Sequence, residues 1–353
     1  MDVITLFTII YYVVCIVPII AFFLLAYNSN PSLNKAITQY LGVTFVLFVV
    51  VIVGFRPIGP NGFNDTEMYI NWLERPNLKL LLAKDLLFGL YIYVCSFFLS
   101  SRVFFVLTVC ISVGLLYWSS VRLAGRKWFL FFMCTAVSLY FWNQQVFTIR
   151  QGIAAMLFTS GVLNRNPVSK IILCISAVGF HFSFALPLLC YGIIYLLNDV
   201  RILTGMWLLS VVIAYFCNKN ITSISGKLIT DTRLDNYWLQ NAIDIIDQNF
   251  RWDVILYSGI LLAVGLWNQR YLKDRDYTRI VSLYIFINIF VIIMTPFTDG
   301  FIHRFAYLSW FLSPLVIFYP MFREKSFNIK KFALIIVFLY FSVSGYLGLK
   351  FVS

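Results

Sequence analysis

Charge is scarce in this chain of 353 residues, because only 12% of them are Asp, Glu, Lys or Arg. Hydrophobic residues make up 61% and aromatic residues 19%, a balance outside the range of soluble globular domains. Apolar runs of roughly 15–25 residues follow one another with short polar breaks, as in proteins whose helices cross a membrane repeatedly. The sequence therefore predicts an all-α, polytopic membrane protein. Its net charge of +12 is explained by basic membrane loops rather than by nucleic acid.

The sequence also lacks the motifs of several large enzyme classes. It contains no Walker loop, no HExxH and no GxSxG. It has only two histidines, and its seven cysteines lie in or beside apolar runs without CxxC spacing, which disfavours a zinc site. We therefore expect no cofactor, no metal ion and no nucleotide in the chemistry of this protein.

The apolar runs predict about 12 transmembrane helices in a single integral membrane domain, 1–353. A further run at 86–99 either crosses the membrane or re-enters it as a short helix. If it does not cross and the N-terminus lies outside, short inner loops hold 15 of the 27 basic residues and four of the acids. This positive-inside pattern favours the arrangement in which 86–99 does not cross the membrane. If 86–99 did cross, the loop at 55–84 would lie in the cytoplasm. The spans are expected at 3–27, 40–54, 103–121, 128–142, 151–163, 168–181, 183–197, 203–217, 253–267, 280–296, 304–320 and 332–350.

Two long loops, 55–84 and 218–252, are expected on the outer face. Within the second loop, apolar residues between Asp235 and Phe250 follow helical spacing. This segment is expected to be an amphipathic helix on the outer surface, acting as a lid or sugar-binding wall. The alternative is a surface helix that only connects two spans.

Arg150 and His181 are the polar residues that most need an explanation. Arg150 and Gln151 open an apolar helix, where a cation opposes the helix dipole. A guanidinium binds phosphate with two parallel hydrogen bonds, so Arg150 is a candidate ligand for an anion, unless it only anchors the helix at the interface. His181, with Ser183, lies between two short spans. It is a candidate proton acceptor or a structural histidine.

Further candidates lie at the same predicted face. In the first outer loop, Asp65 is either a second candidate base or the cap of a helix. His303 is an alternative base beside Arg304, itself either a phosphate ligand or an interfacial anchor. Tyr69 and Trp238 are of a type that stacks on sugar rings. The other candidates for contacts with phosphate, sugar or solvent are Arg56, Arg233, Arg251 and Asp299.

These motifs resemble the EpsG/Wzy family of polysaccharide polymerases over roughly residues 40–320. Arg150-Gln151-Gly152-Ile153-Ala154 is similar to the family's Arg-Gln-x-x-Ala, and His181-Phe182-Ser183 to its His-x-Ser. Arg56 and the segment Asp65-Thr66-x-x-Tyr69 resemble an early arginine and a loop motif of the family, and Arg304 falls where the family has a late arginine.

The resemblance implies a C-type glycosyltransferase architecture and polymerisation of O-antigen, capsule or exopolysaccharide repeats without metal or nucleotide. The substrate would be undecaprenyl-diphosphate-linked oligosaccharide, at the outer face of a bacterial inner or cytoplasmic membrane. Other expected partners are membrane lipid and a chain-length regulator and flippase of the same pathway. In the mechanism, Arg150, with Arg56 or Arg304, would hold the diphosphate, and His181 or Asp65 would accept a proton.

Three other functions fit parts of the sequence. A glycan ligase would have a similar site and differ in its product. A flippase or transporter would place charges inside several spans, whereas the predicted spans here are nearly free of charge. A membrane scaffold would tolerate the loss of Arg150 and His181.

Overall fold

Helices make up all the regular secondary structure of the described residues. The computed structural model describes residues 3–14, 16, 31–58, 64–76, 85–219, 250–297 and 302–323. Within these ranges there is no β-strand, which confirms the all-α prediction. The chain divides into two compact units, residues 1–188 with 318–353 and residues 189–317.

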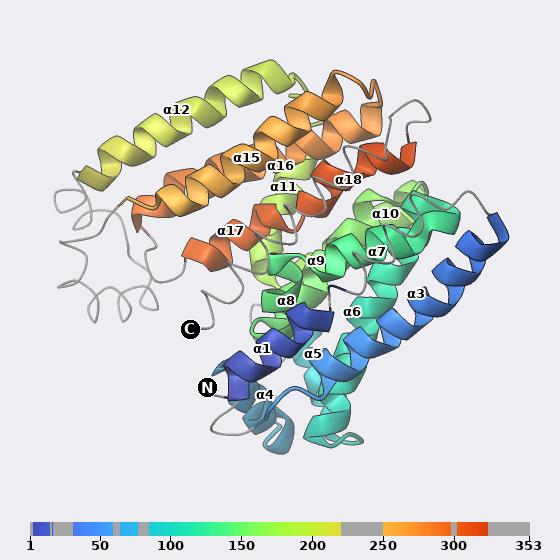
Figure 1. The fold of residues 1–353 in the computed structure, drawn as a ribbon. Coiled ribbons are helices and arrows are strands. Elements are labelled where there is room, and N and C mark those ends of the chain that lie inside the picture. Colours follow the sequence, from blue (N-terminus) through green and yellow to red (C-terminus); the bar gives the residue numbers. More distant parts are fainter. Residues whose placement is uncertain are drawn as a thin grey trace. The chain divides into compact units, whose positions relative to one another are not determined.

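The first unit contains nine helices in its described part (Figure 1). The boundary between the units falls within α11 (Ala185–Ile193) and near the middle of α18 (Ser313–Arg323). The helices of the first unit are α1 (Val3–Val14), α3 (Pro31–Gly54), α4 (Asn64–Glu74), α5 (Leu86–Ser96), α6 (Ser101–Ala124), α7 (Trp128–Ala136), α8 (Leu139–Val146), α9 (Ile149–Val162) and α10 (Pro167–Phe180), with 3₁₀ turns η2 (Gly125–Lys127) and η3 (Phe182–Phe184).

Helix α9 packs against α6, α8 and α10, and its contact with α10 is the most extensive between any two helices (Figure 1). Close approach depends on small side chains, as it does between helices in other membrane proteins. At Gly161, a Cβ atom would lie 2.6 Å from the Sγ atom of Cys174 in α10. Glycine at this position therefore allows α9 and α10 to approach closely near the end of α9.

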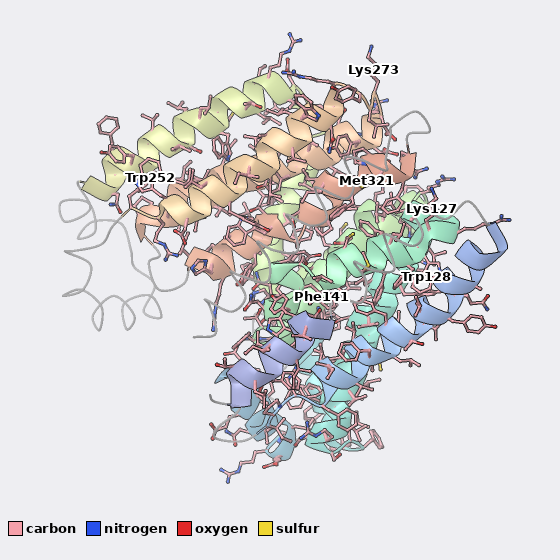
Figure 2. All side chains as sticks on the ribbon, viewed as in Figure 1. Lys127, Trp128, Phe141, Trp252, Lys273 and Met321 are labelled. Atoms are coloured by element: carbon pink, nitrogen blue, oxygen red, sulfur yellow. The ribbon has the colours of Figure 1, made fainter. Side chains whose placement is uncertain are left out.

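The predicted span at 128–142 is wrong in one respect, because the chain breaks it into α7 and α8. Ser138 has an extended backbone, and its hydroxyl accepts a hydrogen bond from the amide of Phe141, 3.3 Å away. The serine thus caps a new helix within an apolar run. At the other end of α7, Trp128 packs its ring 4.8 Å from that of Tyr117, and Figure 2 labels it beside Lys127.

The second unit is organised around α16 (Arg275–Met294), which packs against α12 (Val200–Lys219), α15 (Trp252–Gln269), α17 (Ile302–Trp310) and the turn η5 (Thr295–Phe297). The buried amide of Asn288 accepts a hydrogen bond from Trp207 at 2.6 Å and donates to the hydroxyls of Ser258 and Ser309, each at 3.0 Å. This network joins four helices, and both the oxygen and the nitrogen of the Asn288 amide have hydrogen-bond partners. Trp252, labelled in Figure 2, begins α15.

Four helical segments are long and apolar enough to cross a membrane: Ser101–Ala136, Val200–Asn218, Arg275–Met294 and Ile302–Arg323. The chain is therefore a helical membrane protein. Shorter apolar helices, such as Leu86–Ser96 and Pro167–Phe180, fall below the roughly 20 residues that a perpendicular span needs. The count of about 12 spans stays a prediction.

The predicted span at 304–320 is interrupted, since α17 ends before α18 begins. Pro314, in the first turn of α18, has no amide hydrogen to continue the preceding helix. The single-domain assignment and the loop boundaries at 55–84, 86–99 and 218–252 stay predictions. The final span at 332–350 and the expected amphipathic segment with Trp238 lie outside the described residues.

Candidate functional site

A cluster of charged side chains lies where three helices of the first unit begin or end. Asp85 directly precedes α5, Arg150 lies in the first turn of α9, and His181 follows α10. The Nη1 atom of Arg150 lies 2.6 Å from the Oδ2 atom of Asp85, and the Nδ1 atom of His181 lies 3.5 Å from the same oxygen. The structure thus brings together the arginine and the histidine that the sequence singled out.

The three residues remain partly accessible. The exposed fraction of the side chain is 26% for Arg150, 24% for His181 and 12% for Asp85. The arginine and histidine can therefore reach a ligand, while the aspartate is largely covered by its partners.

Apolar packing brings the helix ends together. Helix α5 packs against both α4 and α10, and α10 packs against α9. Tyr69 and Phe88 belong to a buried apolar cluster, which also contains Ile149, the residue just before Arg150. The charged groups thus rest on a rigid apolar base, which is the arrangement that keeps a site in one geometry.

Aromatic rings surround the guanidinium of Arg150. Its Nε atom donates a hydrogen bond to the hydroxyl of Tyr69 at 3.2 Å. The centre of the guanidinium lies 5.5, 5.8 and 5.9 Å from the ring centroids of Trp72, Tyr69 and Phe88. Ring faces attract cations at these distances, so Arg150 stays charged although it is partly removed from water.

Asp85 is an ionised carboxylate in this environment. Its partial burial acts to raise the pKa, but the polar contact and charge of His181, the amide of Phe182 and the charge of Arg150 together hold the pKa below its ordinary value. The amide of Phe182 donates to Oδ1 at 2.8 Å, whereas Arg150 occupies Oδ2. Asp85 is therefore negatively charged at neutral pH and cannot easily turn away from its partners.

The backbone around His181 is fixed on both sides. Its amide donates to the carbonyl oxygen of Ala177 at 2.9 Å, and its own carbonyl accepts from the amide of Phe184 at 2.9 Å. At 3.5 Å, the contact between its Nδ1 atom and Asp85 is too long for a strong hydrogen bond. The separation is short enough for ionic attraction once the imidazole takes up a proton.

Arg56 is a second, fully buried cation in the same unit. It donates to the carbonyl oxygen of Gln145 at 2.6 Å and lies 4.3 Å from the centroid of the Phe105 ring. Its Nε and Nη2 atoms have no hydrogen-bond partner among the described residues. Burial lowers the pKa of Arg56 to about 9, with Tyr69 opposing and Arg102 adding to the shift, so the residue is still charged at neutral pH.

The other candidates of the first unit lie on α4, on α9 and in η3. Asp65 stands one helical turn before Tyr69 on α4, and its charge acts on both Tyr69 and Arg150. Gln151 is buried in α9, and Ser183 is half-buried in η3. Asp65 is thus close enough to contribute to the field at the site, although Asp85 is the carboxylate that pairs with Arg150.

The predicted residues of the second unit form a separate charged group. Arg251 makes two hydrogen bonds to Asp253, at 2.9 and 2.7 Å, and its Nη2 atom lies 2.6 Å from the Nε2 atom of His303. Arg304 is exposed in the first turn of α17. Arg233 and Asp299 lie outside the described residues.

Sequence reasoning missed Asp85 and Trp72. Asp85 is a lone acid directly before an apolar run, and a search for a counter-ion to Arg150 would have drawn attention to it. Within the described part of the chain, no three His, Cys, Asp or Glu side chains are grouped as a metal site requires.

The fold and the cluster define a helical membrane protein in which one carboxylate lies beside an accessible arginine and an accessible histidine. The family model described as "EpsG family" matches residues 39–352. The chain belongs to the EpsG family, a family of Wzy-type polysaccharide polymerases, which confirms the resemblance seen in its motifs. Comparisons with curated proteins and with solved structures gave no significant match.

Proposed function

We propose that the protein lengthens a polysaccharide by moving a growing glycan from undecaprenyl diphosphate to the non-reducing end of a second lipid-linked oligosaccharide. One observation carries this proposal: Arg150 is partly exposed, and Asp85 and Tyr69 use only its Nη1 and Nε atoms. Its Nη2 atom can therefore donate to a diphosphate oxygen. Membership of the EpsG family supports the same class of substrate.

The proposed reaction is a displacement at the anomeric carbon of the donor sugar. A hydroxyl oxygen of the acceptor sugar forms a new bond to this carbon. The bond between the carbon and the diphosphate oxygen breaks, and its electron pair leaves with the diphosphate. Arg150 stabilises the negative charge that develops on the leaving group. The reaction consumes no metal, nucleotide or oxidant.

The proton of the acceptor hydroxyl goes to His181. Imidazole is the side chain that most often accepts a proton in catalysis, and 24% of the His181 side chain is accessible. Asp65 is the second candidate for the base, since it lies on α4 near Tyr69 and Arg150. Proton acceptance by a positioned group accelerates reactions by roughly 10²–10⁴-fold.

The remaining candidates have supporting roles in this proposal. Arg56 adds a second positive charge near Tyr69, and its Nε and Nη2 atoms are without partners among the described residues. In the second unit, the charged group of Arg251, Asp253 and His303 is suited to polar contacts with a lipid-linked substrate. The residues proposed to contact sugar or phosphate are Tyr69, Gln151, Ser183, Arg251, Arg304, Arg233 and Asp299, the last two outside the described residues.

We place the reaction at the outer face of a bacterial inner or cytoplasmic membrane, as the distribution of basic loops suggests. A C-type glycosyltransferase architecture, with a chain-length regulator and a flippase as partners, belongs to the same proposal. Most charges of the first unit's cluster lie at helix ends, which supports an enzyme working at one membrane surface over a transporter with charges at mid-depth.

The test is to incubate purified protein with undecaprenyl-diphosphate-linked oligosaccharide, a chelator and no nucleotide. A ladder of lengthened glycans on a gel is the expected product. A single transfer of finished polymer to a different acceptor would identify a ligase instead. Movement of the lipid across vesicle membranes without any lengthening would identify a flippase.

A further inference from the structure

Asp85 contacts both residues that the proposed reaction depends on. Its Oδ2 atom lies 2.6 Å from Arg150 Nη1 and 3.5 Å from His181 Nδ1. Its Oδ1 atom accepts the amide hydrogen of Phe182 at 2.8 Å. Because both carboxylate oxygens are held by other groups, the orientation of Asp85 toward the imidazole of His181 is fixed.

We propose that Asp85 is a positioning residue, which holds the His181 imidazole with its proton on Nδ1 and leaves Nε2 as the nitrogen that accepts a proton. The proposal deepens the proposed function and rests on it for the identity of the reaction. The assignment of the histidine tautomer rests on the geometry around Asp85 alone.

The physical reason lies in what each group can donate and accept. An ionised carboxylate only accepts hydrogen bonds, so the imidazole nitrogen that faces it is the favoured site for the single proton of neutral histidine. In His181 that nitrogen is Nδ1, and the lone pair therefore belongs to Nε2. When Nε2 takes up a proton, Asp85 stabilises the resulting imidazolium by ionic attraction.

The same carboxylate orients Arg150. Asp85 holds Nη1 and Tyr69 holds Nε, so one side of the planar guanidinium faces the protein. Among the described residues, no contact of Nη2 is seen, so this atom can donate to a ligand. Asp85 thus determines which edge of the Arg150 guanidinium binds the diphosphate. It also determines which nitrogen of His181 receives the proton.

Labelling with ¹⁵N-histidine tests the proposal on the full chain, because the chain contains only two histidines. The spectrum of the neutral imidazoles in detergent distinguishes a protonated from an unprotonated nitrogen at each ring position. Comparison with His303→Gln assigns the signals of His181. We expect His181 to carry its proton on Nδ1 in the wild-type protein.

Substitution at Asp85 should change this preference. Asp85→Asn keeps the size of the side chain but no longer offers an acceptor-only edge, so the form protonated on Nε2 should become populated. Asp85→Glu keeps the charge and should restore much of the preference for Nδ1. Asp253→Asn is the matched control, because it removes a carboxylate that pairs with the arginine contacting the other histidine. It should leave the signals of His181 unchanged.

Two results would overturn the proposal. One is a wild-type His181 protonated on Nε2, and the other is the same tautomer in wild type and in folded Asp85→Asn. In the polymerisation assay we expect Asp85→Asn to lower kcat by about 10²-fold with a smaller change in KM. If no polymer forms in wild type although the tautomers behave as expected, the proposed function fails and the role of Asp85 in orienting His181 stands.

Discussion

Replacement of Arg150 by alanine should abolish most of the polymerising activity while leaving the protein folded. The substitution removes the cation nearest to the proposed diphosphate position and one of the two hydrogen-bonded partners of Asp85. Loss of one group that stabilises developing charge typically lowers kcat by about 10²–10³-fold, or roughly 3–4 kcal/mol. We expect a reduction of that size.

The effect on stability should be smaller. Arg150 makes one charge-assisted hydrogen bond to Asp85 and a longer one to Tyr69, and its side chain is 26% exposed. Loss of such contacts costs about 1–3 kcal/mol, and water can partly satisfy Asp85 in the variant. The melting temperature should therefore fall by a few degrees only, so inactivity cannot be explained by unfolding.

Two companion variants make the comparison specific. Arg150→Lys keeps the charge but not the planar set of donors, and should recover about a tenfold higher rate than alanine. His181→Ala should be less damaging than Arg150→Ala, because diphosphate is a good leaving group and needs less help from a base. Arg122→Ala is the matched control, since Arg122 bonds to Asn164 at the far end of α6 and should leave the rate nearly unchanged.

The assay is a time course of glycan lengthening with equal amounts of purified, folded variants in proteoliposomes. First-turnover rates separate bond formation from later release of the carrier lipid. If Arg150→Ala and His181→Ala both produced wild-type ladders at normal protein levels, neither residue would act in the transfer, and the proposed mechanism would be wrong.

Gly152→Ala should lower the melting temperature, because its methyl group would lie 2.6 Å from a main-chain carbonyl oxygen of α8; Gly114→Ala, with no described atom within 4 Å of its Cβ, should not. Asn288→Ala should lower the free energy of unfolding by about 1–3 kcal/mol, measured by denaturant titration in detergent, because it leaves the buried indole nitrogen of Trp207 without its acceptor and removes one hydrogen bond each from Ser258 and Ser309; an unchanged midpoint would contradict this. His181→Gln should lower the polymerisation rate, since a glutamine amide cannot accept the proton of the acceptor hydroxyl; an unchanged rate would assign the base elsewhere.

The helical membrane fold could be predicted because the apolar composition and the length of the apolar runs determine it. The helix breaks at residues 137–138 and 311–312 could not, since the apolar runs continue through both. The first break depends on the hydroxyl of Ser138, which caps α8, and the second falls just before Pro314. Such helix breaks depend on a single polar atom or on one missing amide hydrogen. The hydrophobicity averaged over a window of residues does not reveal them.

The candidate site was predicted in part. Arg150, His181 and Tyr69 were identified by residue type and by place in the sequence. In the structure, Arg150 and His181 contact Asp85, and Tyr69 accepts a hydrogen bond from Arg150. Asp85 itself was missed because its partner Arg150 is 65 positions away in the sequence. Only the packing of α5 between α4 and α10 makes them neighbours, and the apolar run at 86–99 gave no indication of that packing.

The central claim is that Arg150 binds the diphosphate of a lipid carrier, and binding of free undecaprenyl diphosphate tests it most directly. This product carries the full charge of the leaving group. The account predicts that Arg150→Ala weakens its equilibrium affinity by roughly 10–150-fold, as loss of a charged hydrogen bond of about 1.5–3 kcal/mol implies, whereas Arg122→Ala binds like wild type. Equal dissociation constants for wild type and Arg150→Ala would contradict the claim.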